Sequence, residues 1–235
     1  MQKEPFRRLC IVLDLDDTLF LERDYVRSGF TAVGDWVKDR FQIHDFAARA
    51  YDYFEQGRRG DIFDAVLKDC CCSPITAADI DSMVAAYRRH SPKISLLPDA
   101  ADFLLFCQGR FDLGLVTDGH PDSQRRKVAA LNIQHLFAVI VMTGEWPNAS
   151  KPNPRAFQHI EERLAAPGMG FCYIADNPVK DFQAPLTLGW TTIRIRREYG
   201  LYASGEGPVD TRPHLEVSSL DSLKPLFDSL FSAGN

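Results

Sequence analysis

The hydrophobic pattern of the chain opens with a short apolar run, Cys10 to Leu13, that ends in three closely spaced acids. An unbroken run of this length is typical of a strand buried on both faces of a parallel sheet. Asp14, Asp16 and Asp17 follow it, with Thr18 directly behind them. Acids at the end of a buried strand repel one another and are costly to desolvate unless a cation lies among them. The stretch therefore indicates a cation site or, alternatively, an acidic turn exposed to solvent.

From Arg23 to His90 the apolar positions recur at helical spacing, and no convincing buried strand interrupts them. Two helical stripes come first, followed by a break at 57–61, a short helix after it, and a last helix for which Thr76 is the expected N-cap. The apolar stripes comprise Val26, Phe30, Val33, Trp36, Val37 and Phe41, then Phe46, Ala50, Tyr53 and Phe54, then Ile62, Val66 and Leu67, and finally Ile80, Met83, Val84 and Tyr87. The pattern predicts an all-helical insert over residues 22–92.

Beyond Pro98 the pattern alternates between apolar strands and amphipathic helices. Strands are predicted at 111–116, 137–142, 171–175, 190–195 and 215–217, and helices at 98–104, 121–131, 157–164, 179–186 and 220–231. Alternation of this kind predicts an α/β fold with a doubly wound parallel sheet, in which ligands bind beyond the carboxyl ends of the strands. We therefore expect a Rossmann-like core formed by residues 1–21 and 93–235, with the helical domain 22–92 inserted into it.

Polar residues follow the predicted strands where a ligand would bind. Thr117, Asp118 and a glycine end one strand, and a hydroxyl with free N–H groups in such a turn can hold phosphate oxygens. Lys151 precedes a helix, and Asp176 ends another apolar strand with Asp181 five residues later. Each signal has an ordinary alternative: a plain turn, a solvated lysine, or a solvated helix acid.

In their order along the chain, these positions resemble the four motifs of the haloacid dehalogenase superfamily, whose members are mostly aspartate-nucleophile phosphatases. The helical insert behind the first motif is similar to the cap of the superfamily's first cap class. The resemblance implies a phosphoric monoester hydrolase that works through an aspartyl-phosphate intermediate. It also implies that Asp14 is the nucleophile and that Asp16 is the general acid and then the base.

The remaining roles follow from the same resemblance. Thr117, the N–H group of Asp118 and Lys151 would bind the phosphoryl oxygens, with Lys151 also offsetting the charge of the nucleophile. Mg²⁺ would be held by Asp14, the backbone carbonyl of Asp16 and Asp176. Asp181 would orient Lys151 or a metal-bound water.

Asp16 also distinguishes phosphatases from dehalogenases within the superfamily. True haloacid dehalogenases resemble this chain in the nucleophile but lack an acid two residues later, because a halide needs no proton to leave. The sequence therefore favours a Mg²⁺-dependent phosphatase for a small phosphate ester, either a sugar phosphate or a nucleoside monophosphate. A phosphomutase of the same superfamily and a non-catalytic binding module are the alternatives.

Substrate specificity is expected in the break between the helical stripes. Arg58 and Arg59 lie there between glycines, and guanidinium groups bind carboxylate, phosphate and sugar oxygens with defined geometry. The alternative is a solvated turn between helices.

Composition limits the classes of partner that the chain is expected to bind. With 45% hydrophobic and 25% charged residues and a net charge of −5, the chain resembles a soluble globular protein rather than a nucleic-acid or membrane-surface binder. No apolar stretch approaches the ~20 residues that span a bilayer, and Asp14 and Asp16 break the only run that resembles a signal peptide. The six cysteines lack the spacing of a zinc site, and a reduced, cytoplasmic protein is expected, with buried thiols at Cys10, Cys107 and Cys172.

Overall fold

A six-stranded, fully parallel sheet forms the centre of the computed structural model, which describes residues 8–70 and 75–234. The strands follow the order β3-β2-β1-β4-β5-β6 across the sheet. Their bounds are Arg8–Leu13 (β1), Asp112–Thr117 (β2), Val139–Met142 (β3), Met169–Ala175 (β4), Thr191–Ile195 (β5) and Leu215–Val217 (β6). The predicted doubly wound parallel sheet is confirmed.

Strand β1 lies in the middle of the sheet and is buried on both faces, as its apolar sequence predicts. Leu13 pairs with Leu115 of β2 and with Ile174 of β4. Ile11 and Leu13 point into one apolar cluster, whereas Cys10 and Val12 point into the other. Because side chains alternate along a strand, an unbroken apolar run is needed to fill both clusters.

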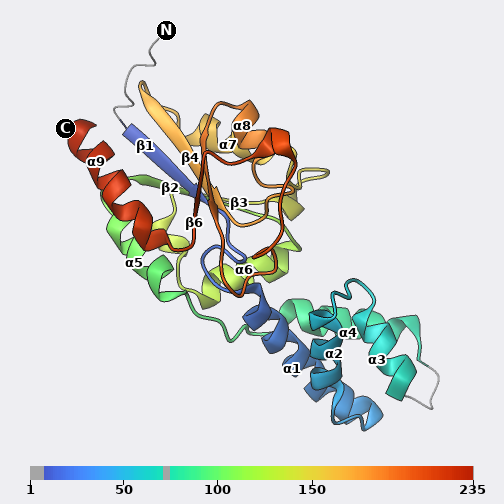
Figure 1. The fold of residues 1–235 in the computed structure, drawn as a ribbon. Helices are drawn as coiled ribbons and strands as arrows, with labels where there is room; N and C mark the ends of the chain where they lie inside the picture. Colours follow the sequence, from blue (N-terminus) through green and yellow to red (C-terminus); the bar gives the residue numbers. More distant parts are fainter. Residues whose placement is uncertain (1–7, 71–74, 235) are drawn as a thin grey trace.

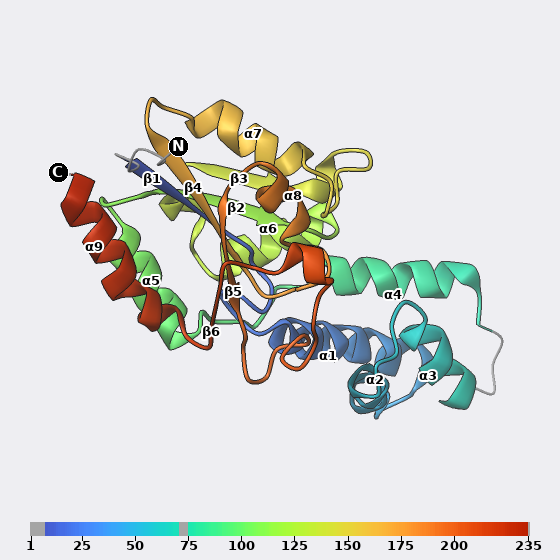
Figure 2. The same ribbon diagram turned by 45° about the horizontal axis from the view of Figure 1, so that its top comes forward.

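Helices cover both faces of the sheet (Figures 1 and 2). Apolar side chains of α5, α6 and α9 pack on the face to which Ile11 and Leu13 point, and those of α7 and α8 pack on the opposite face. These helices are Pro98–Cys107 (α5), Pro121–Ala130 (α6), Arg155–Leu164 (α7), Gln183–Thr187 (α8) and Lys224–Gly234 (α9), with short 3₁₀ turns at Gln134–Leu136, Thr143–Glu145, Val209–Thr211 and Leu220–Leu223.

Four further helices form a separate layer beside the carboxyl end of β1 (Figure 1). Figure 2 shows α1 and α4 running side by side, which carries the chain away from the sheet and back. Phe30, Val33, Phe46 and Met83 belong to a buried apolar cluster of this layer. The helices are Glu22–Phe41 (α1), Phe46–Glu55 (α2), Ile62–Cys70 (α3) and Ala77–Arg89 (α4). The expected run of helices between the first two strands is thus present.

Some predicted bounds were wrong. The helix predicted at 179–186 begins only at Gln183, because the preceding residues form a turn closed by side chains. Within it, the Asn177 carboxamide oxygen accepts the N–H of Val179 at 3.0 Å, and Asp181 accepts the N–H of Asn177 at 2.9 Å. Such local bonds compete with helix formation. Asp181 therefore lies in this turn and not in the first turns of a helix.

Other expectations have mixed outcomes. The buried thiols of Cys10, Cys107 and Cys172 are confirmed. The cysteine run at 70–72 lies partly outside the described residues, so its role stays untested. For residues 196–213, which are rich in glycine and charge, the sequence predicts a surface loop, but this segment is partly buried, since the Arg197 side chain is only 7% exposed.

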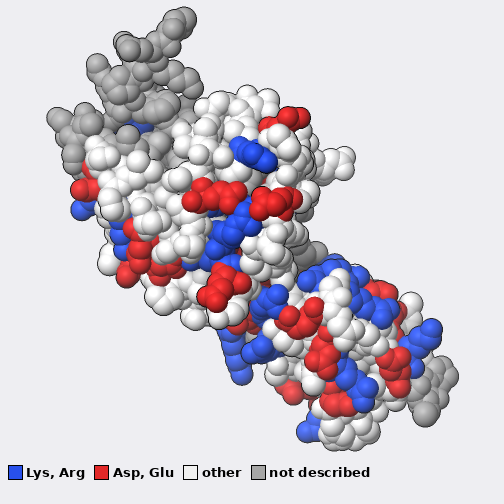
Figure 3. Space-filling model, viewed as in Figure 1, with Lys and Arg blue, Asp and Glu red and all other residues white. Residues whose placement is uncertain are grey.

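The surface mixes charges of both signs. Figure 3 shows Lys and Arg interspersed with Asp and Glu over the visible face of both the sheet layer and the helical layer. Within the described part of the chain, no helix is both long and apolar enough to cross a membrane.

The Thr76 cap gives a test of the helical layer. The Thr76 hydroxyl accepts the N–H of Asp79 at 3.2 Å, and the Asp79 carboxylate accepts the N–H of Thr76 at 3.0 Å, a complete capping box. We expect Thr76→Ala to lower the free energy of unfolding by ~1 kcal/mol, because the N–H of Asp79 loses its side-chain acceptor. Urea denaturation followed by circular dichroism measures the change. Ser82→Ala, an exposed position within α4, should stay within ~0.5 kcal/mol of the parent; equal losses in the two variants would contradict the capping role.

Candidate active site

Asp14 lies at the carboxyl end of β1, the central strand, and its side chain is almost completely buried. The Lys151 ammonium donates to its carboxylate at 2.6 Å. Burial raises the pKa of Asp14 to about 7, although the Lys151 charge acts in the opposite direction. An acidic turn exposed to solvent, the alternative for this stretch, is therefore wrong: Asp14, Asp17 and Thr18 are all buried.

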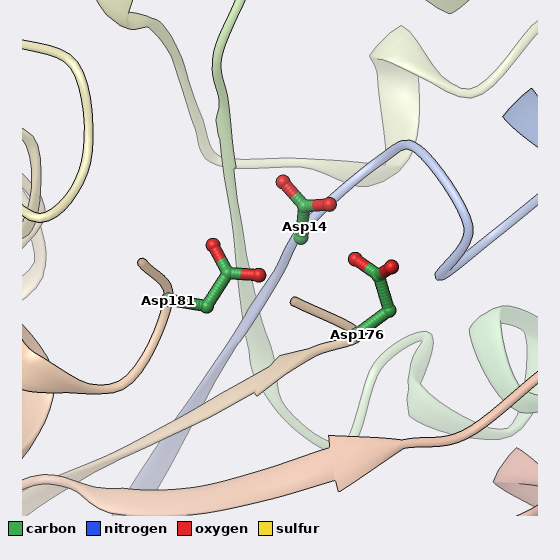
Figure 4. Close-up of side chains that lie close together, drawn as sticks. All are labelled: Asp14, Asp176 and Asp181. Atoms are coloured by element: carbon green, nitrogen blue, oxygen red, sulfur yellow. The ribbon is translucent and has the colours of Figure 1, made fainter. Parts of the chain in front are cut away.

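Two further carboxylates come from the next strand, β4, and the turn behind it. Asp14, Asp176 and Asp181 each offer one oxygen, and these oxygens lie within 4.8 Å of one another (Figure 4). The pKa of Asp176 is raised well above its ordinary value, first by burial and then by the charges of Asp181 and Asp14. An all-oxygen donor set whose members repel one another is suited to a hard divalent cation such as Mg²⁺.

Lys151 is the cation that Asp14 and Asp181 share. Its ammonium lies 2.6 Å from Asp14, 2.7 Å from Asp181 and 3.1 Å from the Tyr173 hydroxyl. Burial lowers the pKa of Lys151, but Asp14 and Asp181 outweigh burial and leave this pKa well above its ordinary value. One oxygen of Asp181 faces Lys151 and the other accepts the N–H of Asn177. Asp14 and Asp176 are consequently the better placed of the three carboxylates to hold a cation.

Asp16 is held by two side chains of α6 that the sequence did not indicate. The Lys127 ammonium donates to its carboxylate at 2.6 Å, and the Gln124 carboxamide donates at 2.9 Å. Gln124 also donates to the Thr117 hydroxyl, so it links the first two motifs. Both side chains are buried, and the three-residue spacing of Gln124 and Lys127 on a helix places them on one face. That spacing, directly behind the Thr117 strand, is the only sequence signal for them.

Asp118 braces the loops around the site. Its carboxylate accepts the Thr143 hydroxyl at 2.6 Å, the N–H of Lys151 at 3.1 Å and the Lys180 ammonium at 3.0 Å. Burial raises the pKa of Asp118, but the charges of Lys151 and Lys180 lower it overall. Lys180 was missed by sequence reasoning; its position beside Asp181, in a turn between two acids, is the signal that could have found it.

Asp17 and Thr18 attach the neighbouring segments instead of lining the site. Asp17 has a left-handed φ of 50°, and its carboxylate accepts the N–H of Glu22 at 2.9 Å and the N–H of Leu201 at 2.7 Å. The Arg197 guanidinium donates to the Thr18 carbonyl at 2.6 Å. Among the described residues the buried Thr18 hydroxyl has no hydrogen-bond partner, so it makes no bond to the acids. Asp17 therefore ties the start of α1 to the loop behind β5.

The family follows from these motifs. Residues 9–189 match the haloacid dehalogenase-like hydrolases. This span includes all the site residues described above from Asp14 to Asp181. The chain belongs to this family. Curated relatives include a phosphoserine phosphatase from Thermus thermophilus, 28% identical over 59% of this chain, and a glyceraldehyde 3-phosphate phosphatase from Methanopyrus kandleri, 32% identical over 57%. The matches cover 55% and 58% of those proteins, so the chain spans just over half the length of these relatives.

Solved structures of the family share the fold. A magnesium-bound HAD hydrolase from Bacillus subtilis has a TM-score of 0.67 at 18% identity, covering 94% of this chain and 99% of the other. An L-2-haloacid dehalogenase from Xanthobacter autotrophicus has a TM-score of 0.61 at 18% identity, covering 94% and 98%. A dehalogenase thus has the same architecture, so the fold alone does not identify the reaction of this chain.

The two arginines of the predicted specificity loop have different surroundings. Arg59 lines a cavity of about 400 Å³ that also reaches Asp16 and Asp118. Arg58 does not line that cavity: its guanidinium pairs with Asp61 at 2.8 Å and lies over the Tyr53 ring. Arg59 therefore lies near the site, whereas Arg58 makes contacts within its own turn and with the neighbouring helix.

Lys151 allows a direct test of the charge balance. We expect Lys151→Met to lower the free energy of unfolding by ~3–5 kcal/mol in chelator at neutral pH, because buried carboxylates lose their shared counter-charge. Urea titration measures it. Lys180→Met is the matched control, since Lys180 is about one-third exposed and its pair with Asp118 is worth at most ~1 kcal/mol. Similar losses in the two variants would show that the acids do not depend on Lys151.

Proposed function

We propose that this hydrolase is a Mg²⁺-dependent phosphomonoesterase that acts on a small phosphorylated metabolite. The observation that carries the proposal is the grouping of Asp14, Asp176 and Asp181, with Lys151 paired to Asp14 and Asp181 and with Asp16 held two residues behind Asp14. The phosphatase relatives, which act on a phosphorylated amino acid and a phosphorylated aldehyde, support a small phosphate ester as the substrate.

Asp14 is the proposed nucleophile. Lys151 occupies one oxygen of its carboxylate, which leaves the other to attack phosphorus and form an aspartyl-phosphate. The Lys151 charge offsets that of the carboxylate and of the incoming phosphate. Bound at Asp14 and Asp176, Mg²⁺ would reduce the repulsion between the anionic nucleophile and the anionic phosphate.

Asp16 is the proposed general acid and base. Lys127 and Gln124 hold its carboxylate on both oxygens, so its direction relative to Asp14 is fixed by α6. From there it would protonate the leaving oxygen and later take a proton from water. The Thr117 hydroxyl and the N–H of Asp118 would bind the phosphoryl oxygens.

The phosphatase assignment depends on Asp16 and not on the fold. The dehalogenase neighbour shares the architecture, but an alkoxide needs a proton to leave whereas a halide does not. Residues 1–21 and 93–235 would act as the catalytic core, and residues 22–92 would act as the domain that covers the substrate. Arg59 is the proposed contact of that domain with the leaving group, and Arg58 supports its loop.

The nucleophile is tested by isosteric substitution. Asp14→Asn should abolish phosphate release, because the carboxamide keeps the shape but not the nucleophilicity, and the melting temperature should be retained. Asp16→Asn should lower kcat by ~10²–10⁴-fold, the range for losing general acid–base catalysis. Release of phosphate from 4-nitrophenyl phosphate measures both. Near-native turnover by Asp14→Asn would refute the mechanism.

The pH dependence of the stabilisation by Mg²⁺ tests the proposed metal site. Raised carboxyl pKa values at Asp14 and Asp176 mean that the metal-free folded protein holds protons more tightly than the unfolded chain does. This stabilisation is complete below the ordinary Asp pKa of 3.8 and is lost as the pH rises toward about 7. Since Mg²⁺ displaces these protons, the rise in melting temperature on adding Mg²⁺ should increase from about pH 5 to about pH 8.

Chelator should also stop turnover, and Mg²⁺ should restore it. Ca²⁺ should bind but support turnover poorly, because it is larger and takes more ligands. Asp14→Asn, which lacks one ionisable ligand, should show a smaller pH effect. Full activity in excess chelator would exclude the metal.

A further inference from the structure

The cavity of about 400 Å³ beside Asp16 has the size of a small-molecule site, for which ~300–1,000 Å³ is usual. On the side of the core it is lined by polar side chains, among them Asp16, Gln124 and Lys127. These are the residues that connect to the proposed phosphate site. If Asp14 attacks a phosphate monoester, as proposed above, the leaving group extends into this cavity.

On the side of the helical layer the cavity is lined by aromatic rings. Tyr87 is their centre: its ring centroid lies 5.5 Å from that of Tyr25, 5.7 Å from that of Phe30 and 6.0 Å from that of Phe63. Phe54 completes the aromatic wall, which consists of Tyr25, Phe30, Phe54, Phe63 and Tyr87. The faces of these rings offer no hydrogen-bond partner, so hydroxyl groups that lie against a ring face would lose water without gaining hydrogen bonds. A planar ring would gain burial and stacking instead.

Among the ionisable groups that line the same cavity, Glu22 and Arg59 have hydrogen-bonding capacity left and lie beside the polar floor and the aromatic wall respectively. Hydrogen bonds from the described residues do not reach the Glu22 carboxylate, which is next to the Lys127 and Asp16 charges. The Arg59 guanidinium lies 3.9 Å from the Phe54 ring centroid, where Nη1 donates to two backbone carbonyls. Within the described part of the chain its Nε and Nη2 have no acceptor. A ligand here needs hydroxyl or N–H donors near the floor and acceptor atoms on a flat ring.

We propose that the cavity binds the nucleoside part of a nucleoside 5′-monophosphate. The ribose hydroxyls would donate to Glu22 beside the polar floor, the base would lie against the aromatic wall, and Arg59 would donate to the acceptor edge of the base. A carboxylate is a good acceptor for a ribose diol, and a guanidinium is a good donor to ring nitrogens and carbonyl oxygens. This inference rests on the proposed phosphomonoesterase function and selects nucleotides over sugar phosphates.

The test compares UMP and AMP with ribose 5-phosphate, using the full chain with Mg²⁺. All three lose phosphate from the same kind of primary 5′ oxygen, so the base is the only relevant difference. We expect kcat/KM to be at least ~10-fold higher for at least one of the nucleotides, mainly through a lower KM, because a stacked base contributes about that much or more. Activity on 4-nitrophenyl phosphate establishes that the preparation is competent.

Substitutions in the aromatic wall test whether the wall causes the preference for nucleotides. Phe63→Leu keeps apolar volume but removes a ring of the wall, and it should reduce the preference for the nucleotide over ribose 5-phosphate by ~5–10-fold. Trp36→Leu is the control, a half-buried ring of the same helical layer that does not line the cavity and whose ring contact is with Phe41. Melting temperatures of both variants show whether they fold, and the parent comparison remains decisive if they do not.

The outcomes separate the two proposals. If a competent preparation hydrolyses ribose 5-phosphate with a kcat/KM equal to or above those of both nucleotides, this inference is overturned and the proposed phosphomonoesterase function is unaffected. Equal loss of preference in Phe63→Leu and Trp36→Leu also overturns it. No release of phosphate from any ester, 4-nitrophenyl phosphate included, overturns the proposed function and this inference with it.

Discussion

The burial of three carboxylates against a single ammonium is the constraint on which the rest of this molecule depends. Asp14, Asp176 and Asp181 lie at the carboxyl edge of the sheet, and Lys151 is the only basic side chain that the described residues place within ion-pair distance of Asp14 or Asp181. Coulomb repulsion at such short range in a buried site is large. The arrangement persists because the strands fix the acids from beneath, and it leaves an excess of negative charge that a divalent cation would offset.

The sheet topology brings those acids together. Because β4 is the neighbour of β1, residues 14 and 176 emerge side by side although most of the chain separates them. The turn behind β4 then returns Asp181 toward Lys151 through the bond between Asp181 and the N–H of Asn177. A helix beginning earlier would have directed Asp181 elsewhere, so the local competition of side-chain bonds with helix formation shapes the site.

The helical layer contributes an apolar surface, which the sheet edge lacks. The site at the sheet edge offers charge and hydrogen bonds that would suit any phosphate, whereas the rings of α1 to α4 form an apolar surface near Asp16. Asp17 holds the start of α1 to the loop behind β5, so the third acid of the opening motif serves to position this layer. The proposed chemistry and the proposed selectivity thus come from different parts of one chain but meet at Asp16.

The sequence by itself determined the elements and the positions of the principal acids. Hydrophobic periodicity is local, and parallel strands bring their carboxyl ends to one edge, so Asp14, Thr117 and Asp176 could be placed before any coordinates. Only the tertiary structure decided which side chains hold Asp16 and which arginine reaches the cavity. Gln124 and Lys127 lie 108 and 111 positions from Asp16. Contacts over such separations depend on how α6 packs, and the helical spacing of the two residues does not reveal which acid they contact. Arg58 and Arg59 are adjacent and chemically alike, and only their tertiary contacts distinguish them: Arg58 pairs with Asp61, whereas Arg59 packs on Phe54 and lines the cavity.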